Sequence, residues 1–258
     1  MLREYNIRII RAVHRFFAPS FDPGDETVTL PRNEAEHLTR VLRLATGDTV
    51  TVFDGRGREF LARVIRADRR DVCVRLISQI HAAAEASVAI TLVQAVLKGD
   101  KMDDIVRDAV MLGAVAIHPI ITKRTETTVA AILKGARVER WHRVALASVK
   151  QSGRATLPEI RTPLGFDDFL GEPRPAVTVM LVEPGAAAGA ESIAVLRKVP
   201  VPLDAAVLVG PEGGWTTEEW TTARQRGVRL MTLGHRTLRA DAVPIAAISV
   251  LQFLWNDL

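Results

Sequence analysis

The stretch Leu208-Val209-Gly210-Pro211-Glu212-Gly213-Gly214-Trp215 decides how the second half of this 258-residue chain is interpreted. An apolar strand ends in a glycine-rich turn, and a helix follows that Thr216 is predicted to cap, with Glu219 as its capping-box partner. Three glycines in five positions let the backbone approach a ligand closely. One glycine would suffice for a plain strand-to-helix turn, which is the alternative interpretation. The stretch therefore predicts a ligand-binding loop at the end of a buried strand.

The same turn indicates which ligand it suits. The sequence contains neither the phosphate-loop pattern GxxxxGK followed by Ser or Thr nor the dinucleotide pattern GxGxxG. Glu212, in the middle of the turn, would repel phosphates and would suit a cationic or hydroxyl-bearing ligand. S-adenosylmethionine (AdoMet) has a sulfonium and a ribose and no phosphate, so it fits this loop better than a nucleotide does.

Strand and helix patterns alternate around this turn. Alternation of this kind predicts a parallel sheet covered on both faces. Ligands of such sheets bind beyond the carboxyl ends of the strands, so the loops after Val182, Val209 and Leu233 are expected to form the site. The predicted strands are 88–96, 116–121, 176–182, 205–209 and 228–233, and the predicted helices are 100–112, 138–150, 192–198, 217–226 and 242–255.

The loop after Leu233 leads into the last helix. Asp241 is predicted to cap this helix, with Pro244 in its first turn, where a missing N–H costs little. Two arginines in this loop, Arg236 and Arg239, either bind an anion or neutralise local acids. The last helix is apolar on nearly every face, so it is either deeply buried or shared with a partner subunit.

The N-terminal third has a different pattern. Short strands predicted at 15–18, 28–30, 49–53, 59–65 and 72–77, with one helix at 34–44, favour a small, partly open barrel. Asn33 and Glu36 are expected to form a capping box for that helix. Cys73 alternates with apolar neighbours and is expected in the core. The expected organisation is an extension at 1–13, which is not a targeting segment, a barrel at 14–80, a linker at 81–87 and an α/β domain at 88–258.

Charge and composition exclude several classes of protein. The chain has 34 Lys plus Arg and 30 Asp plus Glu, and the first 84 residues carry 14 Arg, no Lys and 11 acids, which permits a nucleic-acid partner. A single cysteine excludes an intrachain disulfide and a multi-cysteine zinc site and fits a reducing cytoplasm, and the six histidines lack metal-ligand spacing, so no metal is expected. No apolar run reaches the roughly 18 residues that a membrane helix needs.

Six segments together resemble one family, the bacterial 16S ribosomal RNA uracil-N3 methyltransferases (the RsmE group) of the SPOUT, or trefoil-knot, superfamily. The resemblance covers residues 14–252, and the segments occur in order at matching spacing. They are 37–43 (HLTRVLR), 53–57 (FDGRG), 97–102 (LKGDKM), 151–154 (QSGR), 209–214 (VGPEGG) and 233–239 (LGHRTLR).

The resemblance implies an α/β fold with two parts: an N-terminal PUA-like β-barrel that grips RNA and a C-terminal trefoil-knotted domain with a parallel sheet that binds AdoMet. It further implies a homodimer built through the knot and a substrate in 16S ribosomal RNA, within the small ribosomal subunit. Connection rules alone would argue against a knot, because threaded chains are rare. We expect neither a membrane nor a metal as partner.

The candidate site residues follow from this chemistry. Methylation of uracil N3 removes a proton, so a guanidinium is expected to stabilise charge on the ring carbonyls and a carboxylate or water to take the proton. The catalytic candidates are Arg154, Arg239 and Asp241, although Asp241 is favoured as a helix cap. The expected cofactor-binding residues are Leu181, Val182, Glu183, Val209, Gly210, Pro211, Glu212, Gly213, Leu233, Gly234, Leu238, Arg239 and Ala240. The expected RNA-binding residues are Arg15, Arg32, Arg40, Arg43, Arg56, Arg58, Lys98 and Lys101.

Several polar positions depart from the family pattern. Relatives usually have Glu where this chain has Met111, Lys123 and Lys150, and Thr where it has Ala240. The cofactor loops are kept better, so AdoMet binding transfers more securely than the target base. Two alternatives stay open: an RNA methyltransferase for a ribose 2′-hydroxyl or another base, and a catalytically silent RNA-binding assembly factor. The missing phosphate motifs disfavour a nucleotide-dependent enzyme.

Overall fold

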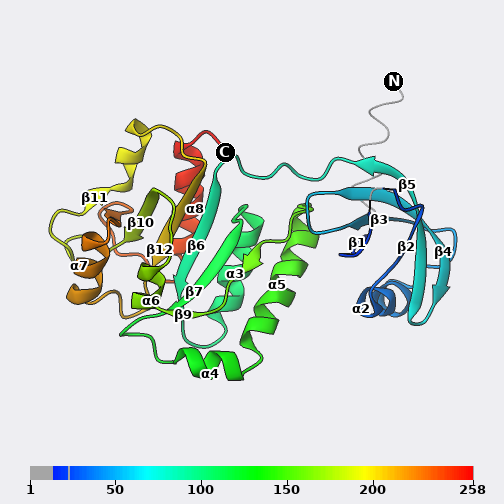
Figure 1. Ribbon diagram of the computed structural model, residues 1–258, viewed down its shortest axis with the longest axis horizontal. Helices are drawn as coiled ribbons and strands as arrows, with labels where there is room; N and C mark the ends of the chain where they lie inside the picture. The colour runs from blue at the N-terminus through cyan, green and yellow to red at the C-terminus, as the bar shows by residue number, and fades with distance from the viewer. Residues whose placement is uncertain (1–13, 23, 258) are drawn as a thin grey trace. The chain divides into compact units, whose positions relative to one another are not determined.

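The computed structural model describes residues 14–22 and 24–257, and the chain divides into two compact units (Figure 1). The first unit contains the chain up to Ala84 together with Val149–Leu157, and the second contains Glu85–Ser148 and Pro158–Leu258. The return of 149–157 to the first unit is a feature that the sequence-based division, with its linker at 81–87, did not include. The predicted extension at 1–13 lies outside the described residues.

The first unit is built on a five-stranded sheet with the order β1-β3-β4-β5-β2. The β1–β3 pair is parallel and the other pairs are antiparallel. The sheet encloses a core that includes Phe16, Val28, Leu38 and Val52, and Cys73 is buried as predicted. All five predicted strands are present: β1 (Arg15–Phe17), β2 (Thr27–Thr29), β3 (Thr49–Phe53), β4 (Glu59–Asp68) and β5 (Asp71–Ile80).

The predicted helix at 34–44 is wrong in its start and in its type. A short α-helix, α2 (Arg32–Glu36), is followed by a π-helical turn, η1 (His37–Val41). Pro31 is the N-cap residue and no side chain caps the helix, so the Asn33 capping box is also wrong. The helix begins one residue before Asn33, and Glu36 instead accepts hydrogen bonds from Arg32 and Arg70 at 3.4 and 3.0 Å.

The segment 149–157 joins the first unit through its backbone. Gly57 N–H donates to Ala155 O at 3.1 Å, and Leu157 N–H donates to Gly55 O at 2.9 Å. These bonds place the segment beside the β3–β4 hairpin, whose backbone groups would otherwise lack partners. The last turn of α5 (Arg137–Ser152) therefore belongs to the same compact unit as the barrel.

The second unit contains an all-parallel sheet with the strand order β11-β13-β10-β12-β6-β7-β8, and β9 also pairs with β7. Strands β6 and β12 are buried at consecutive positions, which shows that both faces of the sheet are covered. The strands are β6 (Ala89–Ala95), β7 (Ala116–Ile121), β8 (Glu159–Ile160), β9 (Leu164–Gly165), β10 (Val177–Leu181), β11 (Glu191–Ser192), β12 (Asp204–Val209) and β13 (Arg229–Thr232).

The five predicted helices of this unit are present, although the one at 192–198 is a 3-10 helix. Helix α8 packs against α3, β6 and β12, as expected for a helix that is apolar on nearly every face. The sequence patterns missed α4 (Val129–Lys134), α6 (Phe166–Gly171) and the three shortest strands. The remaining helices are α3 (Lys101–Met111), η2 (Ile193–Lys198), α7 (Thr217–Gln225) and α8 (Val243–Leu254). No helix in the described part of the chain is long and apolar enough to cross a membrane.

Candidate active site

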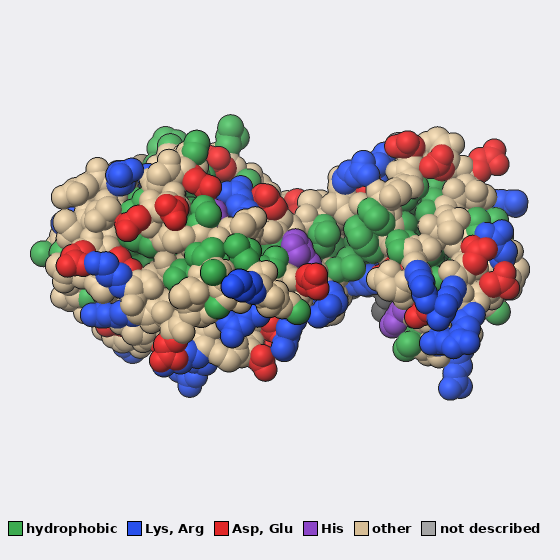
Figure 2. Space-filling view, turned by 60° about the horizontal axis from the view of Figure 1, so that its bottom comes forward, with side chains coloured by type: hydrophobic (Ala, Val, Ile, Leu, Met, Phe, Trp, Pro, Cys, Tyr) green, Lys and Arg blue, Asp and Glu red, His purple; other side chains and the backbone are tan. Residues whose placement is uncertain are grey.

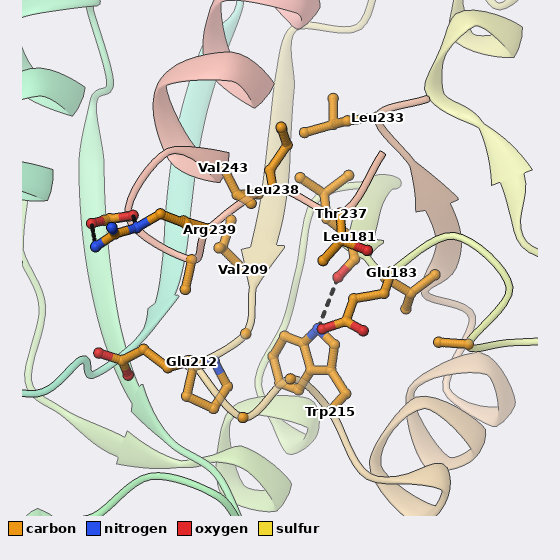
Figure 3. Close-up of a pocket in the computed structure, with 18 of the residues that line it drawn as sticks. Leu181, Glu183, Val209, Glu212, Trp215, Leu233, Thr237, Leu238, Arg239 and Val243 are labelled. Carbon is orange, nitrogen blue, oxygen red and sulfur yellow. Dashed lines mark hydrogen bonds and ion pairs between the residues drawn. The ribbon is translucent and has the colours of Figure 1, made fainter. Parts of the chain in front are cut away.

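Three loops of the second unit meet because the strands that precede them are neighbours. Strands β13, β10 and β12 lie side by side and run parallel, so their carboxyl ends share one edge of the sheet. The loops after them enclose a pocket of about 530 Å³ (Figure 3). This volume lies within the range of about 300–1,000 Å³ that is usual for small-molecule sites. The three loops therefore meet at one pocket, as the alternation of strands and helices predicts.

The pocket contains almost all of the predicted cofactor-binding residues. Every one of them except Gly234 lines it. Two of the three catalytic candidates, Arg239 and Asp241, also lie on its wall. The sequence analysis did not assign a cofactor-site role to Lys101, Arg124, Pro184, Ala186, Gly214, Trp215, Trp220, Arg236, Thr237 and Val243, which complete the lining.

Trp215 ties two of the loops together. Its indole N–H donates to Leu181 O at 2.8 Å (Figure 3), so the loop after β12 is fixed to the end of β10. A Cβ atom at Gly210 would lie 3.0 Å from Trp215 Nε1, so any side chain there would have to displace the indole that holds the two loops together. The side of the indole is also held by Phe166, whose ring centroid lies 5.4 Å away.

The helix after the glycine-rich turn begins as predicted. The Thr216 and Glu219 capping box is present in both directions, with distances of 3.2 and 2.8 Å. Glu219 also accepts a hydrogen bond from the backbone N–H of Lys123 at 2.7 Å. The neighbouring Arg124 donates to Gly213 O at 2.6 Å, which brings the loop after β7 to the pocket wall.

Glu212 is paired with a cation at the pocket rim. Its Oε1 lies 2.7 Å from Lys101 Nζ and accepts a further hydrogen bond from the backbone N–H of Lys98 at 3.3 Å. Partial burial acts to raise the pKa of Glu212, but the bond from Lys101 and the backbone donors outweigh it and hold the pKa below its usual value. The carboxylate in the turn is therefore ionised at neutral pH.

Arg239 and Asp241 form a second pair on the loop after β13. Arg239 donates from Nε and Nη2 to the two carboxylate oxygens at 3.2 and 3.1 Å. The predicted helix cap is wrong, because Ala242 is the N-cap of α8 and no side chain caps it. Partial burial acts to raise the pKa of Asp241, but the hydrogen bonds from Arg239 lower it overall, which makes this carboxylate a weaker proton acceptor.

Arg236 differs from the other cations of the pocket. Lys101, Arg124 and Arg239 each donate to an acceptor, whereas Arg236 is exposed and makes no side-chain hydrogen bond or ion pair with the described residues. Its position in the segment 233–239 was the sequence signal for it, because two arginines in such a loop need anions or water. A guanidinium without an internal partner is available to a ligand.

Arg154, the third catalytic candidate, does not line this pocket. It belongs to the first unit, where it is 3 % exposed. Its backbone carbonyl accepts a hydrogen bond from Arg15 Nη2 at 2.8 Å. The sequence could not show that Arg154 is buried, because a cation in the turn after a helix has the same local pattern as a cation in a ligand-binding loop after a strand.

The predicted RNA-binding residues divide into internal and available side chains. Arg15 is internal: it donates to both Glu59 oxygens at 2.8 and 2.9 Å and to three backbone carbonyls. Arg58 is held by the buried carboxylate of Asp54 at 2.6 Å, and Arg56 donates to Pro19 O at 2.6 Å. These internal hydrogen bonds leave Arg15 and Arg58 few donors for a contact with RNA. In the second unit Lys98 pairs with Glu126 at 2.5 Å, and Lys101 pairs with Glu212. Arg32 is paired with Glu36, whereas Arg40 and Arg43 are exposed.

The departures from the family pattern have partners in this chain. Lys123 Nζ pairs with Glu218, and Lys150 Nζ lies 2.5 and 2.6 Å from the two oxygens of Glu34. Each lysine, at a position where relatives usually have a glutamate, is therefore balanced by a carboxylate nearby. Met111 is 42 % exposed at the end of α3, and Ala240 lies on the pocket wall.

Comparison with known proteins identifies both units. A family model described as an RNA methyltransferase domain matches residues 84–252, and one described as an RNA methyltransferase PUA domain matches residues 30–77. The chain is 32% identical over 232 residues to the ribosomal RNA small subunit methyltransferase E of Synechocystis sp., covering 89% of this chain and 74% of that protein. It is 29% identical to the protein of that name from Aquifex aeolicus, covering 86% of this chain and 92% of the relative.

Solved structures agree over nearly the whole chain. A ribosomal RNA small subunit methyltransferase E from Neisseria gonorrhoeae bound to S-adenosyl methionine matches with a TM-score of 0.83 and 32% identity, covering 94% of this chain and 98% of the other. A Legionella pneumophila protein solved with the same cofactor matches with a TM-score of 0.84 and 30% identity, covering 93% and 97%. The chain therefore belongs to the RsmE-type ribosomal RNA small subunit methyltransferases, SPOUT proteins that join a PUA-like barrel to a trefoil-knotted domain with a parallel sheet.

Proposed function

We propose that this protein transfers a methyl group from AdoMet to N3 of a uridine in 16S ribosomal RNA of the small ribosomal subunit. The observation that carries the proposal is the convergence of the three loops on one pocket, which takes in all predicted cofactor residues except Gly234. The family and the AdoMet-bound relatives support the cofactor and the substrate class. We also infer action in the cytoplasm, where a ribosomal substrate is found.

The pocket fits AdoMet in size and in the character of its walls. Gly210 keeps backbone and indole close together, and Leu181, Leu233 and Leu238 supply apolar contact for an adenine. The carboxylate of Glu212 suits a cationic ligand, and the sequence lacks the loop patterns that bind a nucleotide's phosphates. When bound, AdoMet supplies an electrophilic methyl group on a sulfonium.

The side chains of the loop after β13 suit the charge that develops during the reaction. Uracil N3 becomes nucleophilic when it loses its proton, and negative charge then spreads to the ring carbonyls. Arg239 and the unpartnered Arg236 present guanidinium groups at the pocket, where such a group stabilises that charge. Arg154, the other guanidinium candidate, belongs to the first unit, so the pocket itself supports Arg239 and Arg236 for this role.

The proton of N3 passes to a carboxylate or to water. Glu212 and Asp241 have lowered pKa values because Lys101 and Arg239 donate to them, so they accept a proton weakly. Glu183 is the pocket carboxylate without an ion pair in the described part of the chain, and we assign it this role. A Glu183→Gln variant is expected to lower kcat while the Kd for AdoMet stays within about threefold, and a large loss of AdoMet affinity would instead make it a ribose ligand.

We further infer that the protein acts as a homodimer. Large apolar side chains lie exposed on and near α8: Val201 is 53 % exposed, Leu203 89 %, Ile245 40 % and Phe253 60 %. Exposed apolar groups of this kind favour an interface over contact with water. Sedimentation tests this inference: the wild type should sediment as a dimer, and the Leu203→Asp and Phe253→Asp double variant should sediment as a monomer. A wild type that sediments as a monomer at micromolar concentration would contradict it.

The central test is methylation of small-subunit particles from a strain that lacks the enzyme. With tritiated AdoMet we expect label in 16S ribosomal RNA, and mass spectrometry of the digested RNA should identify 3-methyluridine. A methylated ribose or another base would replace the proposed target, and absence of methylation together with tight RNA binding would favour the assembly factor.

A matched variant tests the pocket itself. Gly210→Val places carbon atoms against Trp215, so calorimetric titration should show loss of AdoMet binding, by roughly 100-fold or more, in a protein that remains folded. Gly171→Val serves as the control for AdoMet affinity, because Gly171 belongs to the same unit, lies outside the pocket lining and has no atom within 4 Å of an added Cβ. Unchanged AdoMet affinity in Gly210→Val would remove this loop from the site.

A further inference from the structure

The π-helical turn of the first unit combines unusual backbone with unpaired positive charge. η1 (His37–Val41) is a π-helix, and Arg43, two residues beyond it, has a φ of 55°. π-Helical turns are rare and occur frequently at functional sites, and a non-glycine residue with positive φ is uncommon. The proposed catalytic mechanism uses neither feature.

Five arginines gather around this turn, and we name them the arginine patch: Arg32, Arg40, Arg43, Arg69 and Arg70. Arg32 and Arg70 both reach Glu36, at 3.4 and 3.0 Å, and Thr39 Oγ1 donates to Arg69 O at 3.4 Å, which brings the β4–β5 turn beside η1. Figure 2 shows Lys and Arg side chains gathered on the part of the first unit that carries α2.

The patch has more positive charge than its carboxylates neutralise. Glu36 is the carboxylate that the patch arginines contact in the described structure, and the neighbouring Glu34 is buried and bound by Lys150. On the adjacent turn Asp71 is bound by Arg66 at 2.8 Å, and Asp68 also acts on Arg66. Arg40, Arg43 and Arg69 are exposed and have no side-chain partner among the described residues.

An apolar side chain stands among these charges. Val41 is 65 % exposed, although it lies at the end of a segment whose Leu38 is fully buried. Cations that follow a phosphate backbone, with an apolar surface between them for an unstacked base, are the combination that single-stranded RNA requires. A protein partner would have to bring a separate carboxylate to each guanidinium, whereas the phosphates of an RNA strand supply negative charge at every nucleotide.

We propose that the arginine patch binds the phosphates of a single-stranded RNA segment and that Val41 contacts an unstacked base of that segment. This inference rests on the proposed RNA substrate and names the surface of the barrel that holds it. It replaces the internal Arg15 and Arg58 of the sequence-based prediction by Arg69 and Arg70.

The test is the salt dependence of binding to a 16S ribosomal RNA transcript, measured by fluorescence anisotropy. An Arg40→Gln and Arg69→Gln double variant should lower the log–log slope by about 1.4, since each lost contact to single-stranded RNA contributes about 0.7. The matched control is Arg63→Gln with Arg75→Gln, which removes two exposed arginines at paired positions of β4 and β5 and should leave the slope unchanged. Equal slopes for the patch variant and the wild type, or an equal drop in the control, would overturn the proposal.

Two further variants separate charge from shape. Arg43→Gly keeps the positive φ and should lower the slope by about 0.7, whereas Arg43→Lys should restore it. Val41→Ser should weaken binding roughly threefold without changing the slope, because it removes no charge. An unchanged affinity for Val41→Ser would remove the base contact from the proposal.

AdoMet titration and methylation by the same proteins distinguish failure of this inference from failure of the proposed function. The patch variant should bind AdoMet as the wild type does and should show a raised KM for RNA. A wild type that methylates the particles while the patch variant keeps its KM and slope would overturn only the patch. A wild type that binds neither transcript nor particles would overturn both proposals.

Discussion

Both units contain a pair of an arginine and a carboxylate, but the pair is buried in the first unit and exposed in the second. In the first unit, Arg15 pairs with Glu59, with side chains that are 15% and 6% exposed, and Lys150 pairs with Glu34. Arg15 also donates to the backbone carbonyl of Lys150, and we call these four residues the ion-pair cluster. In the second unit, the pocket pair Arg239 and Asp241 has side chains that are 78% and 32% exposed. Arg15 makes five hydrogen bonds inside the protein, whereas Arg239 has most of its surface free.

This difference shows why residue type alone does not define a role. A buried ion that loses its partner keeps its desolvation penalty, so a pair of this kind holds the structure together. An exposed pair contributes little to folding and can exchange its partner for a ligand at small cost. We therefore expect substitutions in the cluster to act on stability and substitutions at the pocket to act on binding and catalysis.

Arg15→Met should have the largest effect on stability. It leaves the Glu59 carboxylate buried without its cation, and the carbonyl groups of Val149, Lys150 and Arg154 lose a donor. The expected loss in unfolding free energy is about 4 kcal/mol, measured by urea denaturation. Arg56→Gln, an exposed neighbour with one hydrogen bond to Pro19 O, should cost less than about 1 kcal/mol. A loss below about 1 kcal/mol for Arg15→Met would contradict the cluster's structural role.

The Glu34 and Lys150 pair should show direct coupling of smaller size. We expect a double-mutant cycle of Glu34→Gln and Lys150→Met to give a coupling free energy of about 2 kcal/mol. This coupling free energy is smaller than the loss of unfolding free energy expected for Arg15→Met, because the Lys150 side chain is 24% exposed and partly solvated. Unfolding free energies of the two single variants and the double variant supply the measurement, and additive single effects would show that the pair is independent.

His118 should make the stability of the second unit depend on pH. Its ring is 2 % exposed and packs edge-on against Phe169, and burial lowers its pKa below 6.5, with smaller opposing and reinforcing effects from Glu172, Arg161 and Glu159. The unfolded chain therefore binds the proton more readily than the folded protein does. Stability should be constant above about pH 6.5 and should fall below it, by at most about 1.4 kcal/mol per pH unit.

The control for this prediction is His118→Leu, which has a similar volume and no titratable group. The difference in unfolding free energy between this variant and the wild type should change between pH 7.5 and 5.5. A difference that stays constant over that range would mean that protonation of His118 does not contribute.

Arg239→Gln should have the smallest effect on stability and a large effect on the reaction. Because the pair is exposed, we expect a change in unfolding free energy of less than about 0.5 kcal/mol. Loss of the guanidinium should lower kcat roughly 100-fold on small-subunit particles, since it removes stabilisation of the ring carbonyl charge. A variant with normal kcat would transfer that role to Arg236, and the same assay on Arg236→Gln would show it.

Local patterns predicted much of the fold. The Thr216 and Glu219 capping box and the longer strands of both units follow from local residue patterns, so they were visible in the sequence, whereas the two-residue strands β8, β9 and β11 were not. The Asp241 cap failed because Arg239, two residues away, competes for the same carboxylate. The π-helical turn at 37–41 was missed because its apolar spacing resembles that of an α-helix.

By itself, the sequence determined the alternation of strands and helices, the glycine-rich loop and the family, because short-range chemistry and motif order record them. Only the tertiary structure decided which charged residues are internal. Arg15 and Arg40 are both arginines of the N-terminal third, yet one contacts Glu59 and backbone 134 to 139 residues further along the chain, and the other faces water. Burial lowers the local dielectric and fixes partners across the chain, and no pattern of neighbouring residues contains that information.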